Sequence, residues 1–152
     1  MEAAQLDERV LSVLRLKAPG VWSISPDSTV YEAIERMADK RVGALLVLDE
    51  GKLTGIVSER DYARKVILRN KHSQETRVRE IMTAPVLSVG PDHSIHECMS
   101  IMSASRVRHL PVVEGETVMG IVSIGDLVNW IIRSQEQTIN QLHNYITGAY
   151  PA

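Results

Sequence analysis

The 152-residue chain is long enough for one ordinary domain, and its 44% apolar and 24% charged residues are typical of a soluble globular protein. Its net charge of −2 argues against a general nucleic-acid binder, whose surface is strongly basic. No apolar run approaches the roughly 18 residues of a membrane span, and the acidic N-terminus does not resemble a signal peptide. The single cysteine, Cys98, excludes an internal disulfide framework. We therefore expect a cytoplasmic protein that does not enter a membrane.

The first expected element is a short helix over residues 6–17. Leu6, Val10 and Leu14 recur there at four-residue steps and give the helix one apolar face. The Ala18-Pro19-Gly20 stretch interrupts this pattern and ends the helix. We treat residues 1–17 as an N-terminal helix that precedes the main domain.

Residues 18–70 predict a β-α-β-β-α unit. An extended segment at 21–25 leads into a turn, where Asp27 or Ser28 is expected to cap a helix. The continuous apolar run at 44–50 predicts a strand buried on both faces. A hairpin turn then leads to a second strand at 53–58 and a helix over 59–69.

The same order returns 65 residues later. The string GIVSERD at 55–61 recurs as GIVSIGD at 120–126, and residues 21–63 align with 86–128 without a gap. The second copy is predicted to have an extended segment at 86–89, a helix at 94–104, strands at 109–114 and 118–123, and a helix from Ile124. Such self-similarity indicates one supersecondary unit used twice. The predicted fold is α/β (α+β), with two β-α-β-β-α repeats, 18–70 and 81–133, packed as a pseudo-twofold pair. Residues 71–80 are a polar linker, and 134–152 form a C-terminal extension of the last helix.

The repeated G-I-V-S-x-x-D string places a serine and an aspartate at the start of a helix in each copy. Ser58 and Ser123 can face a phosphate at the helix N-terminus, and Asp61 and Asp126 can accept hydrogen bonds from two vicinal hydroxyls. The same spacing also describes a capping box, in which the serine and the acid satisfy backbone N–H groups. The residues alone leave both interpretations open.

The two copies differ in their basic residues. Arg60 of the first copy corresponds to Gly125 of the second, while Arg108 and His109 replace a glycine and an alanine of the first copy. Arginine suits phosphate recognition because its guanidinium offers two parallel donors and keeps its charge. The alternative is an exposed charged pair at a strand edge.

Taken together, the repeats, the element order and the G-h-V-S-x-x-D strings resemble a tandem CBS-domain (cystathionine-β-synthase-type) protein. The IMTAP stretch at 81–85 and the RHLPVVE stretch at 108–114 are similar to that family as well. Because no catalytic domain is attached, the chain resembles a stand-alone pair of the kind called a Bateman module. The resemblance covers about residues 21–133.

This resemblance implies a ligand and a set of binding residues. Family members bind adenine nucleotides such as AMP, ATP, NAD or S-adenosylmethionine in clefts between the repeats, and modules commonly pair into homodimers. The base is often held by backbone groups, here around 83–86, where Thr83 could add its hydroxyl. The nucleotide-binding residues that we expect are Ser58, Arg60, Asp61, Thr83, Arg108, His109, Ser123 and Asp126.

The expected function is therefore a non-enzymatic regulatory sensor of energy or redox state, acting on an unidentified partner protein. The alternative is a protein-interaction or scaffold module in which one or both clefts are vestigial. Catalysis and metal binding are not expected, because no Walker A loop or nucleophile motif is present and nothing completes a zinc set around His93 and His96. Cys98 falls on an apolar helix face, where a small buried side chain fits.

Overall fold

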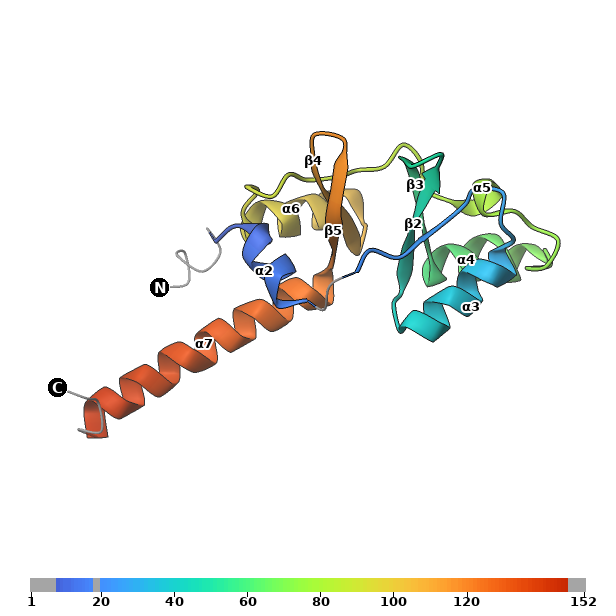
Figure 1. The fold of residues 1–152 in the computed structure, drawn as a ribbon. Helices are drawn as coiled ribbons and strands as arrows, with labels where there is room; N and C mark the ends of the chain where they lie inside the picture. Colours follow the sequence, from blue (N-terminus) through green and yellow to red (C-terminus); the bar gives the residue numbers. More distant parts are fainter. Residues whose placement is uncertain (1–7, 18–19, 148–152) are drawn as a thin grey trace. The chain divides into compact units, whose positions relative to one another are not determined.

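The computed structural model describes residues 8–17 and 20–147 (Figure 1). These residues divide between two compact units. The first-repeat unit holds residues 20–88 and the segment 113–120. The second-repeat unit holds the described residues up to 17, the segment 89–112 and the chain from 121 onward. Both contain helices and strands, so the predicted α+β class is confirmed.

A small sheet forms the centre of the first-repeat unit. Its strand order is β1 (Ser23–Ile24), β2 (Ala44–Asp49), β3 (Lys52–Ser58), with β1 parallel and β3 antiparallel to β2. The first four residues of β2 are buried, as the continuous apolar run predicts. The unit also contains the helices α3 (Val30–Lys40), α4 (Glu59–Lys65) and α5 (Val78–Ile81) and the 3-10 turn η1 (Ile67–Arg69). The predicted helix over 59–69 is therefore broken into α4 and η1.

Helix α3 begins later than expected. Its N-cap is Thr29, whose Oγ1 accepts a hydrogen bond from the Glu32 N–H at 3.1 Å, while Glu32 Oε2 accepts one from the Thr29 N–H at 3.1 Å. The expectation that Asp27 or Ser28 caps this helix is wrong. The Asp27 carboxylate instead pairs with Arg79, and the reciprocal Thr29–Glu32 capping box satisfies two backbone donors at the helix start.

The second-repeat unit contains the helices α2 (Val10–Leu16), α6 (Ile95–Ser105) and α7 (Ile124–Thr147). The strands β4 (His109–Glu114) and β5 (Thr117–Ser123) pair in a hairpin, and residues 109–112 and 121–123 of these strands belong to this unit. The predicted helix over 6–17 is shorter, and its first two residues lie outside the described part of the chain. The segment 86–89 is not a strand; its Val89 makes one isolated parallel bridge to Val112. Helix α7 continues through 134–147, so the C-terminal extension is helical over that stretch.

Each repeat is completed by the short helix that precedes the other repeat. The Val78 N–H donates to the Ser28 carbonyl at 2.9 Å, and the Val10 N–H donates to the His93 carbonyl at 2.8 Å, so α5 joins the first repeat and α2 joins the second. The side chains of Val78 and Val10 are fully buried in the respective cores. The segment 71–80, expected to be a polar linker, therefore contributes to a hydrophobic core.

Gly55 marks a close backbone approach in the first-repeat unit. A Cβ added there would lie 2.6 Å from Met82 Sδ and 3.2 Å from the Thr83 carbonyl oxygen. The Ile56 N–H donates to this carbonyl at 3.1 Å, so the segment cannot retreat without weakening a hydrogen bond.

We expect Gly55→Ala to lower the free energy of unfolding by about 1–3 kcal/mol, because overpacking forces Met82 and its backbone to shift. Urea unfolding measures this change. The matched control is Gly125→Ala in the first turn of α7, where the nearest atom would be Ser123 Oγ at 3.6 Å, an ordinary contact. An equal loss in the free energy of unfolding for Gly55→Ala and Gly125→Ala would contradict the close-approach argument.

Candidate nucleotide site

The helices α4 and α7 both begin with a closed capping box. In α4, Ser58 Oγ accepts from the Asp61 N–H at 3.2 Å, and Asp61 Oδ2 accepts from the Ser58 N–H at 3.0 Å. In α7, Ser123 Oγ accepts from the Asp126 N–H at 3.1 Å, and Asp126 Oδ2 accepts from the Ser123 N–H at 2.8 Å. The capping interpretation is therefore fulfilled in both repeats. Since the boxes use Oδ2, Oδ1 of each aspartate remains for another partner.

In the first repeat, Oδ1 is already engaged. Lys65 Nζ lies 3.2 Å from Asp61 Oδ1, one helical turn along α4, and donates to the Ile81 carbonyl at 2.9 Å. The Ser58 hydroxyl also donates to Asp61 Oδ2 at 3.0 Å. With 14% of its side chain exposed, Asp61 is held on both oxygens.

In the second repeat, the lysine comes from another element. Lys17, the C-cap of α2, places Nζ 2.8 Å from Asp126 Oδ2 and donates to the Ile121 carbonyl at 2.7 Å. Among the described residues, Asp126 Oδ1 makes no hydrogen bond or ion pair. The Asp126 side chain is 26% exposed, so solvent and small solutes can reach its carboxylate.

The charge of Asp126 is set by opposing effects. Burial raises the pKa of its carboxyl group, but the hydrogen bonds from Lys17 and from the Ser123 backbone stabilise the anion more strongly. The net result is a pKa below the ordinary value. Asp126 is therefore a carboxylate at neutral pH and can only accept hydrogen bonds.

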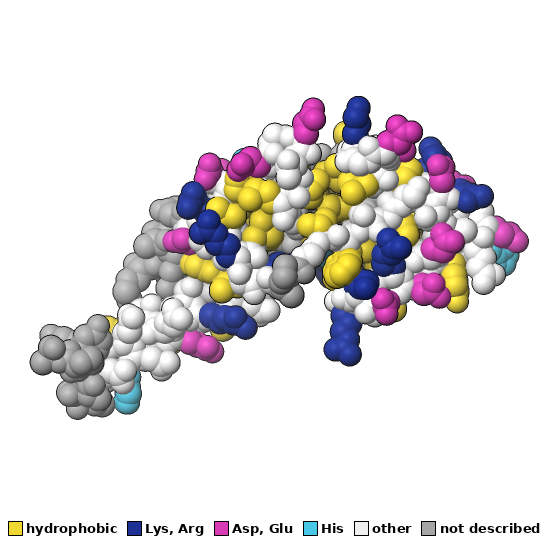
Figure 2. All heavy atoms as spheres, viewed as in Figure 1, with side chains coloured by type: hydrophobic (Ala, Val, Ile, Leu, Met, Phe, Trp, Pro, Cys, Tyr) yellow, Lys and Arg dark blue, Asp and Glu magenta, His cyan; other side chains and the backbone are white. Residues whose placement is uncertain are grey.

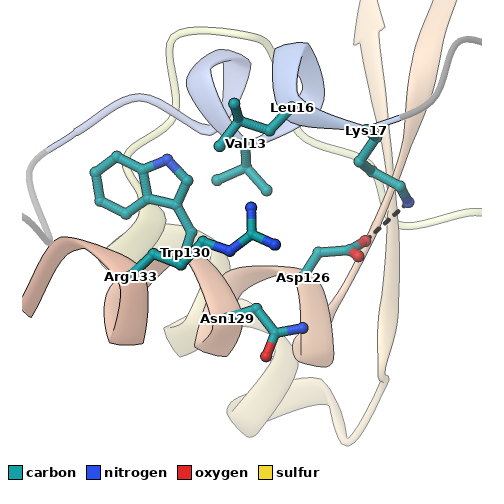
Figure 3. A pocket seen from close by; sticks show the side chains of 7 residues that line it. All are labelled: Val13, Leu16, Lys17, Asp126, Asn129, Trp130 and Arg133. Atoms are coloured by element: carbon teal, nitrogen blue, oxygen red, sulfur yellow. Dashed lines mark hydrogen bonds and ion pairs between the residues drawn. The ribbon is translucent and has the colours of Figure 1, made fainter. Parts of the chain in front are cut away.

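A cavity of about 240 Å³ lies between α2 and α7, within the second-repeat unit (Figure 3). Along α7 its lining residues follow the spacing i, i+3, i+4 and i+7, which places them on one helix face. Figure 3 shows Asp126, at the start of α7, pointing toward Lys17, at the end of α2. The full lining is Val13, Leu16, Lys17, Asp126, Asn129, Trp130 and Arg133.

Three polar residues of this cavity were not predicted from the sequence: Lys17, Asn129 and Arg133. The helical spacing from Asp126 could have indicated Asn129 and Arg133. Lys17 had no such signal, because the position 65 residues later holds Met82. Trp130 both packs against the core and lines the cavity.

Arg108 and His109 lie at the beginning of β4 in this unit. Burial is the main cause that lowers the pKa of His109; the positive charges of Lys17 and Arg108 lower it further, and Asp126 partly offsets them. The lowered pKa keeps His109 neutral near pH 7, so it can offer a hydrogen bond but no positive charge. Arg108 is exposed, and its carbonyl accepts from the Ile124 N–H at 2.9 Å.

The other predicted residues gather in the first-repeat unit. Thr83 lies beside β3, where its N–H donates to the Ile56 carbonyl at 2.9 Å and its own carbonyl accepts from the Ile56 N–H. Its backbone groups are therefore occupied, and the exposed side chain is what remains for a ligand. Arg60 is exposed in the first turn of α4, one residue before Asp61.

Metal and thiol chemistry find no support in the described part of the chain. No group of three or more His, Cys, Asp or Glu side chains there could hold a metal ion. His93 Nδ1 instead accepts from the Gly90 N–H at 2.9 Å. Burial, followed by the nearby Glu97 charge, raises the pKa of the Cys98 thiol to about 11, so the buried side chain stays protonated.

None of the helices in the described part of the chain is long and apolar enough to span a membrane.

The ion pair with Lys17 gives a pH-dependent prediction. We expect Lys17→Met to lower the free energy of unfolding at pH 7 by roughly 0.5–1 kcal/mol, because the pair is partly exposed. A lowered pKa in the folded state contributes stability above the unfolded pKa, and that contribution is lost as pH falls through the folded pKa. The difference from the parent should therefore begin to shrink as pH falls below the ordinary Asp126 value of 3.8, and vanish below the lower pKa of the folded state.

Urea unfolding from pH 7 down to pH 2 measures this difference. The control is Lys52→Met on β3, which removes an exposed lysine from the first-repeat unit. A Lys17→Met effect that stays constant across this pH range would contradict the ion-pair assignment.

Comparison with known proteins identifies the repeats. The sequence model described as "CBS domain" matches residues 16–68 and 78–133. A CBS domain-containing protein of Arabidopsis thaliana, named as mitochondrial, is 37% identical over 139 residues, which are 88% of this chain and 68% of that protein.

Solved structures agree with this match. A putative signal-transduction protein with CBS domains from Burkholderia ambifaria is 46% identical and has a TM-score of 0.82. The alignment covers 84% of this chain and 96% of that protein's chain. A CBS domain pair solved in complex with 5′-methylthioadenosine and S-adenosyl-L-methionine is 27% identical and has a TM-score of 0.70. The alignment covers 80% of this chain and 94% of that chain. Both ligands of that pair contain adenosine.

Proposed function

Since this chain belongs to the CBS domain family, we propose that it is a regulatory module that binds an adenosine-containing ligand such as AMP, ATP, NAD or S-adenosylmethionine. In this proposal the module is cytoplasmic and homodimeric, is not an enzyme, and acts on another protein. A ligand that favours one conformation over another shifts the population of the module, and this shift is the signal.

The observation that carries the proposal is the Asp126 carboxylate. One of its oxygens is fixed by Ser123 and Lys17, and the other makes no bond among the described residues. A carboxylate held in one orientation is a strong acceptor for ribose hydroxyls, and the lowered pKa keeps Asp126 charged. Hydrogen bonds to charged groups contribute roughly 1.5–3 kcal/mol.

Neighbouring groups suit the remainder of a nucleotide. Arg108 supplies a guanidinium for phosphate, and neutral His109 supplies a hydrogen bond. Lys17 and Arg133 add positive charge at the cavity that Asp126 lines. A volume of about 240 Å³ lies below the roughly 300–1,000 Å³ typical of ligand pockets, so this cavity would enclose part of a nucleotide.

The first-repeat residues Ser58, Arg60, Asp61 and Thr83 form a weaker companion site in this proposal. A ribose there competes with Lys65 for Asp61 Oδ1, whereas a ribose at Asp126 displaces no partner from Oδ1. We therefore expect the Asp126 site to fill at lower ligand concentration.

The second candidate function is a protein-interaction module with a vestigial cleft. The engagement of both Asp61 oxygens favours this alternative for the first repeat alone. It predicts that adenosine ligands leave the stability of the chain unchanged.

A thermal-shift panel tests the proposal with AMP, ADP, ATP, NAD, NADH and S-adenosylmethionine, and with guanosine nucleotides as controls. A ligand at about 100 times its dissociation constant stabilises by roughly 2.7 kcal/mol, which raises Tm by several degrees. We expect a shift that is selective for adenosine ligands and is lost in the Asp61→Asn/Asp126→Asn double variant. An unchanged Tm with every ligand would favour the interaction module.

A further inference from the structure

The second half of α7 lacks the packing that stabilises its first half. Leu127 is fully buried, and Ile124, Trp130 and Ile131 pack against the core. From residue 135 to 144 every residue except the half-buried Thr138 is exposed. Figure 1 shows this half running away from α2 and α6 of its own unit. A single helical segment of this length is marginal in water, so a partner surface would stabilise it.

An exposed apolar stripe runs along α7, and we call it the α7 seam. With Gln135 included, its positions 128, 132, 135, 139, 142 and 146 are separated alternately by four and three residues. This is the a/d spacing of a heptad repeat. Isoleucines occupy the three a positions, and Val128, Gln135 and Leu142 occupy the d positions. The exposed fractions are 39% for Val128, 46% for Ile132, 63% for Ile139, 52% for Leu142 and 81% for Ile146.

The residue types of the α7 seam indicate how helices would pair along it. β-Branched residues at a with leucine at d favour parallel two-stranded coiled coils. A single polar residue at an a position of a coiled coil is known to specify the register, and the same argument extends to a polar residue at d, because each copy can hydrogen-bond its counterpart. Gln135 is placed to do this, since two copies in register bring the two amides together.

The charges near the α7 seam favour a second copy over other partners. Between residues 134 and 147 the sequence has one acidic residue, Glu136, and no lysine or arginine. Two copies therefore meet without strong like-charge repulsion, and a membrane surface would call for lysine or arginine along the polar face. Figure 2 shows mostly uncharged polar side chains at this end of the helix.

We propose that two copies of this chain associate through the α7 seam as a short parallel coiled coil. The contact is isologous, so each a and d side chain meets its own counterpart across a twofold axis. This pairing is separate from nucleotide binding, and it places the C-terminal ends of the two α7 helices side by side.

Cysteine cross-linking of the full chain tests the parallel register. Leu142→Cys, at a d position, should form a disulfide-linked dimer under mild oxidation, whereas Gln141→Cys, at the outward c position, should not. The native Cys98 is fully buried and does not interfere. Adding Ile139→Asp should abolish the Leu142→Cys cross-link. If Leu142→Cys cross-links no faster than Gln141→Cys, the proposal is wrong.

Sedimentation velocity gives an independent measurement of association. Ile139→Asp should raise the dimer dissociation constant at least tenfold, because it places a carboxylate in the seam. The matched control Gln137→Asp adds the same charge at the outermost f position and should leave the constant unchanged. A monomeric parent chain, or equal constants for the two variants, would overturn the proposal.

Discussion

Leu45→Ala and Leu110→Ala are each expected to lower the free energy of unfolding by about 2–5 kcal/mol. The two leucines occupy equivalent positions of the two repeats, and neither side chain is exposed. Each belongs to a separate core cluster, one in each unit. Truncation removes apolar burial and leaves a cavity that the surrounding strand and helices can only partly fill.

Urea unfolding of the two variants measures these losses. Leu68→Ala is the matched control, because 77% of Leu68 is exposed and its truncation should change stability by less than about 0.5 kcal/mol. A loss below about 1 kcal/mol at either core leucine would show that its unit is not packed as described.

Asp126→Asn is expected to weaken the binding of an adenosine ligand by about tenfold or more. The estimate follows from the roughly 1.5–3 kcal/mol of a hydrogen bond to a charged group, at 1.4 kcal/mol for each tenfold change. Asp61→Asn should have a smaller effect, because Lys65 already occupies the remaining oxygen of Asp61. Equilibrium binding to the full chain measures both changes.

The control for this prediction must remove a capping carboxylate without touching the site. Glu97→Gln does so, since Glu97 is the third residue of α6 and closes a capping box with Ser94 in the same unit. It should change stability slightly and leave ligand affinity unchanged. Equal weakening by Glu97→Gln and Asp126→Asn would mean that the loss comes from the helix start and not from ribose recognition.

Local patterns were sufficient to predict the repeats and most of their elements. The buried run of β2, the two hairpins and the buried Cys98 follow from hydrophobic periodicity and from the recurrence of the G-I-V-S string. The cap of α3 was missed because Asp27, Ser28 and Thr29 all favour that position. The choice among them depends on which residue stands three positions before Glu32.

Long-range packing explains the remaining differences. Helix α5 packs on the first repeat and α2 on the second, and no local pattern in the sequence indicates this. A short polar stretch with one valine, such as 71–80, is interpreted from sequence as a linker. Lys17 was missed for the same reason, since it meets Asp126 only when α2 packs onto the second repeat. The lowered pKa of His109 comes from burial and from neighbouring charges, which its sequence position does not show.

Calorimetric titration of the full parent chain tests the central claim most directly, using the ligand that gives the largest thermal shift. The account predicts one tight, saturable site per chain, attributed to Asp126, followed by a weaker site or none. Asp126→Asn should remove the tight site and leave the weaker one. Two equal sites, a tight site that survives Asp126→Asn, or no saturable heat with any adenosine ligand would contradict it.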